Sequence, residues 1–164
     1  MKKYIRFTLI GLLLILLLLQ FVRPAKNQSG DATKDISTIF PVPASVQTTL
    51  RAACYDCHSN YTTYPWYAGV QPVRWWLDNH INDGKRHLNF SEFAAYPLPR
   101  QYHKLEEVSE IVGNGEMPLQ SYTLIHRDAV ISSEQRKEMI DWADALRDTM
   151  KAHYPMDSLV MKRK

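Results

Sequence analysis

Cys54-Tyr55-Asp56-Cys57-His58 is a C-x-x-C-H run, and it contains the only two cysteines of the 164-residue chain. This spacing is the attachment signature of c-type haem. Each thiol can add to one vinyl group on the edge of the haem, and the histidine that follows then lies beneath the iron as an axial ligand. The run therefore predicts one covalently attached haem c, bound through Cys54 and Cys57 and ligated by His58.

Other roles for a cysteine pair fit this run less well. A structural zinc site normally has four Cys or His ligands in paired spacing, and no second pair accompanies this one. A thioredoxin-like redox pair lies beside a βαβ pattern, which the chain lacks. A disulfide across two intervening residues would leave His58 without a role.

The N-terminus carries an export signal of some kind. Met1-Lys2-Lys3 is basic, and residues 7–22 are almost purely apolar. A spanning helix needs about 20 apolar residues, with about 17 as the lower limit, and residues 4–22 reach that limit if Arg6 extends toward the headgroups. No small-x-small cleavage site follows, which favours an uncleaved transmembrane anchor over a cleaved signal peptide. We expect an inner-membrane anchor with the domain in the periplasm, or a soluble exported domain if the signal is cleaved.

Composition divides the chain into four parts. Residues 1–22 form the signal anchor or signal peptide, 23–39 a polar linker, 40–152 the haem-binding domain and 153–164 a basic C-terminal tail. The net charge of +3 is misleading, because all 17 acidic residues but only 15 of the 20 Lys and Arg follow position 26. The exported part is mildly acidic and has no basic stripe for nucleic acid. An acidic face could instead steer the domain toward a basic redox partner protein.

The domain is predicted to be all-α, a small cytochrome c-like helical fold. Apolar residues recur at helical spacing, and no run alternates with period two. Gly84 and Gly113 are interpreted as stop signals, and residues 85–101 as a long connection. Ser132 and Gln135 form a capping box for the last helix, which carries an apolar stripe. The expected helices cover residues 43–57, 72–82, 104–112 and 132–150.

Met117 is the candidate for the sixth iron ligand. It lies in Gly115-Glu116-Met117-Pro118, a loop that glycine can turn sharply and proline stiffens. A methionine and histidine pair raises the reduction potential relative to two histidines. The alternative is that Met117 only packs in the core, as methionines often do.

Other side chains could also meet the haem. His87 is the alternative sixth ligand to watch, since it lies in an unusual cluster, Arg86-His87-Leu88-Asn89-Phe90. Histidines on apolar faces or in connections are more often structural, which is the expected role of the remaining candidates. Arg74 and Arg86 could pair with the haem propionates, and a solvent-facing role is an equal alternative. The remaining candidates are His80, His103 and His126.

Taken together, these motifs resemble the haem-binding domain family over residues 40–146. That family comprises small exported or membrane-tethered c-type cytochrome domains of bacteria. The resemblance implies covalent haem at Cys54 and Cys57 with His58 as axial ligand, but no particular reaction. It rests on Cys54-Tyr55-Asp56-Cys57-His58-Ser59-Asn60, Tyr64-Pro65-Trp66-Tyr67, His87-Leu88-Asn89-Phe90-Ser91, Gly115-Glu116-Met117-Pro118 with Tyr122, and Trp142.

Two main functions compete for such a domain. As a membrane-tethered periplasmic electron carrier, it would cycle its iron between two oxidation states, and it would not be an enzyme. As a haem enzyme or a sensor of peroxide or a small gas, it would need an open or displaceable sixth position. His87 or His126 with Arg86 or Arg127 could then supply acid–base groups. A third reading is a haem subunit of a larger complex. A sixth ligand from Met117 favours the carrier.

Overall fold

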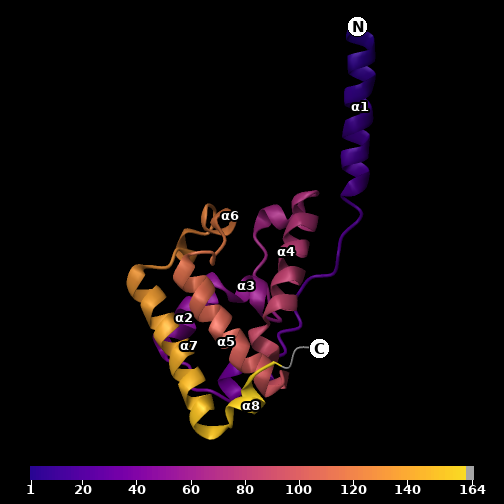
Figure 1. Ribbon diagram of the computed structural model, residues 1–164. Coiled ribbons are helices and arrows are strands. Elements are labelled where there is room, and N and C mark those ends of the chain that lie inside the picture. Colours follow the sequence, from indigo (N-terminus) through magenta and orange to yellow (C-terminus); the bar gives the residue numbers. More distant parts are fainter. Residues whose placement is uncertain (162–164) are drawn as a thin grey trace.

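The computed structural model describes residues 1–161, and the regular elements in this part of the chain are all helices, without a β-strand. The predicted all-α class is therefore confirmed. Within these residues, four short 3₁₀ helices (η) are interspersed among the α-helices, whose arrangement Figure 1 shows. In order, the elements are α1 (Lys2–Leu19), η1 (Ile36–Thr38), α2 (Ala44–Ala53), α3 (Tyr55–His58), η2 (Trp66–Gly69), α4 (Val73–His87), η3 (Phe90–Ala95), α5 (Leu98–Asn114), α6 (Gln120–Thr123), η4 (Arg127–Ala129), α7 (Ser133–His153) and α8 (Met156–Leu159).

Helices α5 and α7 lie side by side and together supply the largest share of the core (Figure 1). The predicted capping box is present, because the Ser132 side chain accepts from the Gln135 amide and the Gln135 side chain accepts from the Ser132 amide. The predicted apolar stripe of α7 is buried against α5 and α2. Its members are Met139, Trp142, Ala143, Leu146 and Met150.

Two glycines expected to end helices lie inside them. Helix α4 continues past Gly84 to His87, and α5 continues past Gly113 to Asn114. The residue that ends α5 is Gly115, whose φ of 75° places it in the left-handed region that glycine adopts without strain. A glycine in a helical pattern thus marks a helix end only where the backbone takes that conformation.

The predicted connection over residues 85–101 is mostly structured. Its first three residues finish α4, its centre forms η3, and its last four begin α5. Pro97 is the N-cap of α5 and a further proline lies in the first turn, where a missing N–H removes no helical hydrogen bond. Phe93 of η3 is fully buried, so this segment is part of the core.

The segment predicted as a linker is packed onto the domain. Ile36 is fully buried in the core, and the Asp35 side chain caps η1 by accepting from the Ser37 amide. Earlier in the segment, the Asn27 side chain donates to the Ser59 carbonyl and to the Thr62 hydroxyl. The polar composition of residues 23–39 therefore reflects hydrogen bonding to the domain rather than a free tether.

The two ends of the chain differ in how they relate to the helical body. Helix α1 projects away from the helical body and has no buried residue (Figure 1). It has 18 residues, including Lys2, Lys3 and Arg6. The sequence predicts a spanning anchor here, whereas none of the helices of residues 1–161 combines the length and apolarity needed to cross a membrane. In the C-terminal tail, Leu159 of α8 is buried in the core, and the basic residues 162–164 lie outside the described residues.

Candidate functional site

The C-x-x-C-H run forms a short helical turn between two longer helices. Cys54 ends α2 and begins α3, and its carbonyl accepts from the amides of Cys57 and His58 at 3.1 and 2.9 Å. This turn holds both cysteines and His58 in a fixed relation, and α3 packs against α4. Both cysteines are free thiols.

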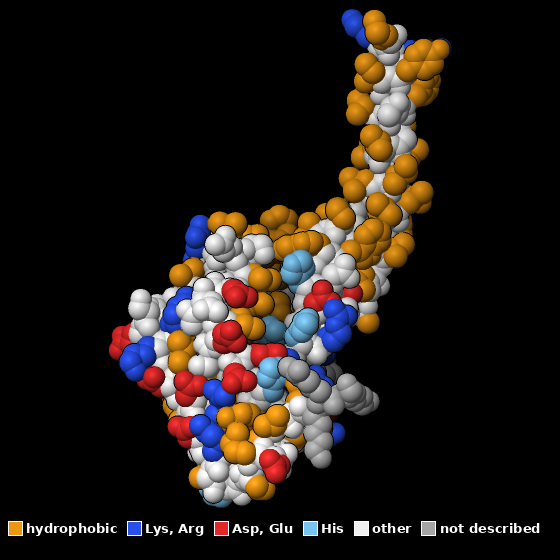
Figure 2. Space-filling view, in the orientation of Figure 1, with side chains coloured by type: hydrophobic (Ala, Val, Ile, Leu, Met, Phe, Trp, Pro, Cys, Tyr) orange, Lys and Arg blue, Asp and Glu red, His pale blue; other side chains and the backbone are white. Residues whose placement is uncertain are grey.

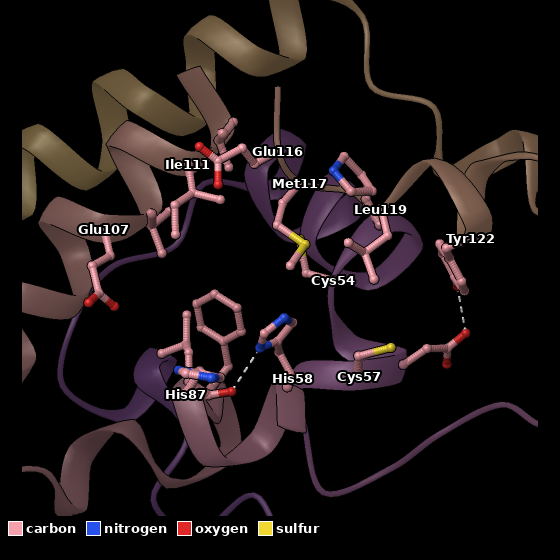
Figure 3. Close-up of a pocket in the computed structure, with 18 of the residues that line it drawn as sticks. Cys54, Cys57, His58, His87, Glu107, Ile111, Glu116, Met117, Leu119 and Tyr122 are labelled. Carbon is pink, nitrogen blue, oxygen red and sulfur yellow. Dashed lines mark hydrogen bonds between the residues drawn. The ribbon is translucent and has the colours of Figure 1, made fainter. Parts of the chain in front are cut away.

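His58 is oriented by the backbone of the loop after α4. Its Nδ1 lies 2.9 Å from the Leu88 carbonyl, which can only accept, so Nδ1 carries the proton and Nε2 presents its lone pair (Figure 3). Burial lowers the pKa of His58, although the nearby Leu88 and Gly84 carbonyls act in the opposite direction. A neutral imidazole with a fixed tautomer is the form in which histidine ligates a metal.

The pKa values of the two thiols are raised, whereas a thioredoxin-like redox pair needs a lowered one. Burial raises the pKa of Cys54 to about 12, and burial together with Asp56 raises the pKa of Cys57 to about 11. The reactive cysteine of a thioredoxin-like pair has a lowered thiol pKa instead. Nowhere in residues 1–161 do three His, Cys, Asp or Glu side chains gather as they would around a zinc ion.

A cavity of about 620 Å³ opens beside this turn. Figure 2 shows the face that it occupies, where hydrophobic side chains surround a hollow and histidines lie at its margin. Helices α3 and α4 form one wall, and α5 with the loop after it forms the other. Its apolar lining includes Leu88, Phe90, Val108, Ile111, Val112, Leu119 and Met139.

Met117 enters this cavity from the wall facing His58 (Figure 3). The left-handed Gly115 turns the chain at the end of α5, which brings the next residues back over the cavity. Cys54, Cys57, His58 and Met117 thus line one cavity although Met117 is remote in sequence. A second methionine, Met139 of α7, also contributes to the lining and is fully buried.

The histidine alternatives divide into two groups. His80 and His87 also line the cavity, on the α4 side. His126 does not line the cavity itself, but its ring stacks on that of Tyr122, which does, and its Nε2 lies 2.9 Å from the Tyr67 hydroxyl. His103 faces Glu106 and Glu107 on α5. His87 is therefore the predicted alternative that the fold brings close, while His103 and His126 have structural partners.

The structure does not bring the two expected propionate partners together at the cavity. The Arg74 guanidinium turns to the segment after α1, where its Nη2 donates to the Pro24 carbonyl at 3.0 Å. Arg86 is largely exposed and pairs with Asp83 at 2.6 Å. Neither side chain lines the cavity, because both extend from other faces of α4.

Asp56 and Tyr122 both lie in the motifs on which the resemblance rests, but the contact between them becomes visible only in the structure. The Tyr122 hydroxyl donates to Asp56 Oδ2 at 2.8 Å (Figure 3). The Thr63 amide donates to the other oxygen, Oδ1, at 2.9 Å. Burial and the Asp56 carboxylate raise the pKa of Tyr122. The bond ties α6, just after Met117, to the turn that carries the cysteines.

We expect Tyr122→Phe to destabilise the protein by about 1.5–3 kcal/mol, because a partly buried hydrogen bond to a carboxylate is lost. Urea denaturation of the purified protein measures this change. Tyr61→Phe is the matched control, since the Tyr61 side chain is half exposed and its hydroxyl makes no hydrogen bond within residues 1–161. Equal stabilities of the two variants would contradict a role for the Asp56–Tyr122 contact.

The role of Gly84, like the contact between Asp56 and Tyr122, is visible only in the structure. A Cβ atom on Gly84 would lie 2.6 Å from the Cys57 carbonyl oxygen and 3.2 Å from the Cys57 Cβ. The obstacle is backbone, which cannot move aside as a flexible side chain can. Glycine at this position therefore sets the close approach of α4 to the cysteine-bearing turn.

We expect Gly84→Ala to cost about 1–3 kcal/mol of stability, because the two helices must separate. That separation also disturbs the bond from His58 to Leu88, one turn further along the chain. Gly113→Ala is the control, since a Cβ there meets only the Ile140 Cδ1 at 3.7 Å and a helix interior gains about 0.5–1 kcal/mol from alanine. Thermal denaturation of both variants checks the opposite signs, and a neutral Gly84→Ala would refute the close-approach argument.

These residues fit a haem. An apolar cavity, a histidine with its Nε2 lone pair available, two adjacent thiols and a facing thioether are the groups that such a cofactor requires. A family model described as a haem-binding domain matches residues 14–145. No curated protein and no solved structure matches the chain. Because the family model covers most of the sequence, the chain belongs to the haem-binding domain family and is a haem-binding protein.

Proposed function

We propose that this protein is a monohaem c-type cytochrome that carries electrons. The observation that supports this best is that one and the same cavity is lined by Cys54, Cys57, His58 and Met117. When bound, the haem supplies an iron that alternates between the ferrous and ferric states. The chain's own residues attach the haem, ligate its iron and tune its potential.

Cys54 and Cys57 attach the cofactor. Each thiol S–H adds across one vinyl double bond, with sulfur bonding to one carbon and hydrogen to the other, so no oxidant is required. The fixed turn of α3 presents the two thiols on one side of the cavity together with His58. A haem held by these two thiols would lie beside His58, whose Nε2 lone pair would ligate its iron.

His58 and Met117 set the redox properties. The Leu88 carbonyl holds the imidazole in one tautomer and increases its basicity as a ligand. The Met117 thioether, a soft ligand, stabilises the reduced iron relative to a second histidine and raises the reduction potential. Both effects suit a carrier that must accept and release one electron without binding a substrate.

An acidic rim supports transfer to a basic partner protein. Glu107, Glu110 and Glu116 all line the cavity, and the last two are exposed. Complementary charge steers diffusional encounter between redox partners and weakens as salt is added. We therefore propose a partner with a basic docking face.

A redox titration combined with carbon monoxide binding tests the carrier function. We expect a reversible one-electron transition and little carbon monoxide binding by the reduced protein, because the Met117 thioether would fill the sixth coordination position of the iron. The competing function is a haem enzyme or sensor, and the placement of His87 in the same cavity is the observation that favours it. Rapid carbon monoxide binding by the native protein would support that alternative over the carrier.

We further propose that the domain works outside the cytoplasm, where haem is attached to C-x-x-C-H runs in bacteria. The basic start of the chain and the exposed apolar helix α1 support export. Alkaline phosphatase fused after residue 161 should be active in the periplasm, and deletion of residues 1–19 should abolish this activity. Activity that survives the deletion would contradict export through α1.

A further inference from the structure

A second cavity, of about 350 Å³, lies where the segment after α1 meets η2 and the start of α4. It shares no lining residue with the haem cavity. Three of its lining side chains are cationic, and none is acidic. The cations are Arg23, Lys26 and Arg74, and the aromatic lining comes from Tyr64 and Trp66.

Arg74 is a buried charge without a compensating carboxylate. Only 4% of its surface is exposed, and its guanidinium carbon lies 4.4 Å from the centre of the Tyr64 ring. Nη2 donates to the Pro24 carbonyl, whereas Nε is buried and has no hydrogen-bond partner among the described residues. Within residues 1–161 Arg74 makes no ion pair. A buried, unpaired charge is costly unless an anion accompanies it.

The other two cations converge on the same space. The Lys26 ammonium lies 5.5 Å from the centre of the Tyr64 ring, on which Arg74 also packs. Arg23 donates through Nε to the Gln20 carbonyl at 2.9 Å, which leaves its terminal nitrogens for another acceptor. In the described part of the chain, neither Arg23 nor Lys26 pairs with an acidic side chain.

The backbone that carries Arg23 and Lys26 is fixed in place. Gln71 is 1% exposed, and its amide and side chain bond to Gln20 and to the Val22 carbonyl. The Trp75 indole donates to the same Val22 carbonyl. The Asn27 side chain is held by the loop that follows the haem turn. The three cations therefore surround a preformed space, which lowers the entropy cost of binding.

We propose that this cavity binds a phosphate oxyanion. Guanidinium groups hold phosphate through paired N–H donors, and an ammonium adds a point charge. Such a group could be free phosphate or the headgroup of an anionic phospholipid. The cavity begins four residues after the apolar helix α1, and Trp66 beside it is 86% exposed, so either source has access.

Calorimetry with inorganic phosphate and flotation with vesicles test the proposal on the purified full-length haem protein. The vesicles are phosphatidylcholine alone or a mixture with phosphatidylglycerol. The first variant is Arg74→Gln. Because Arg74 is buried and its replacement could affect folding, the second variant combines the exposed changes Arg23→Gln and Lys26→Gln. Lys137→Gln on α7 is the control, since Lys137 is exposed and remote from the cavity. An unchanged haem spectrum shows that each variant is folded.

We expect saturable phosphate binding that both cavity variants weaken about tenfold or more, since each loses charge-assisted hydrogen bonds. The control variant should bind as the native protein does. A second supporting result is that the native protein floats only with the vesicles that contain phosphatidylglycerol, that the cavity variants do not float, and that free phosphate does not bind. This result would identify a lipid headgroup as the source of the phosphate. Absence of phosphate binding together with vesicle binding that the variants leave unchanged would overturn it.

Discussion

Replacing both Cys54 and Cys57 with alanine should abolish covalent haem. These are the only cysteines in the chain, and both line the cavity beside His58. Acid–acetone extraction separates haem held by iron ligation alone from haem held by thioether bonds. We expect all haem in the double variant to extract and none in the native protein, because the double variant has no thiol left to form a thioether.

The single variants and His58 provide the controls. Cys54→Ala or Cys57→Ala should retain one thioether and yield less haem protein. His58→Ala should reduce the yield more than His80→Ala, because His58 alone combines adjacency to the cysteines with the bond to Leu88. Haem that stays bound to the double variant through extraction would refute covalent attachment at this site.

Met117→Ala should retain covalent haem but change the iron to a five-coordinate or water-bound high-spin state. Loss of the thioether should lower the reduction potential by on the order of 0.1 V or more, a fraction of the roughly 0.8 V span that axial ligands control. Carbon monoxide should then bind readily to the reduced protein. Optical spectra and potentiometry measure these three changes.

Two variants distinguish ligation by Met117 from packing. Met117→His should restore a low-spin iron at a potential below that of the native protein. Met139→Leu is the matched control, since Met139 lines the same cavity but lies buried on the α7 stripe. If Met117→Ala kept the native spectrum in both oxidation states while Met139→Leu altered it, the assignment of Met117 would be wrong.

Local patterns predict the parts of the fold that local chemistry controls. The capping box at Ser132 and the spacing of the apolar residues after it define α7 without tertiary information, and the structure confirms both. The C-x-x-C-H run predicts haem because the attachment chemistry depends on five consecutive residues. Met117 can be identified from the sequence as a candidate iron ligand, because its Gly/Pro loop interrupts the helical periodicity on either side.

Contacts between residues far apart in the sequence determine the roles of several residues that local patterns do not predict. The helical pattern predicts a stop at Gly84, whereas the actual constraint on this residue is the backbone of Cys57, which periodicity cannot show. Tyr122 meets Asp56 across 66 positions of sequence. Arg74 is a propionate candidate in the sequence, but its direction on α4 takes it to Pro24 and Tyr64 instead.

The segment predicted as a linker shows that composition, too, misses contacts within the protein. Residues 23–39 have no apolar periodicity, which is typical of a tether. Their polar side chains bond to the loop after the haem turn, and one apolar residue, Ile36, anchors the segment in the core. Polar composition cannot distinguish a solvated chain from one whose polar groups are paired within the protein.

The visible and near-infrared spectrum of the oxidised native protein tests most directly whether His58 and Met117 hold the iron between the two walls of the cavity. We expect a low-spin spectrum with a sulfur-to-iron charge-transfer band that Met117→Ala removes. A high-spin spectrum, or a low-spin spectrum without that band, would contradict this ligation and indicate an open site or a second histidine ligand.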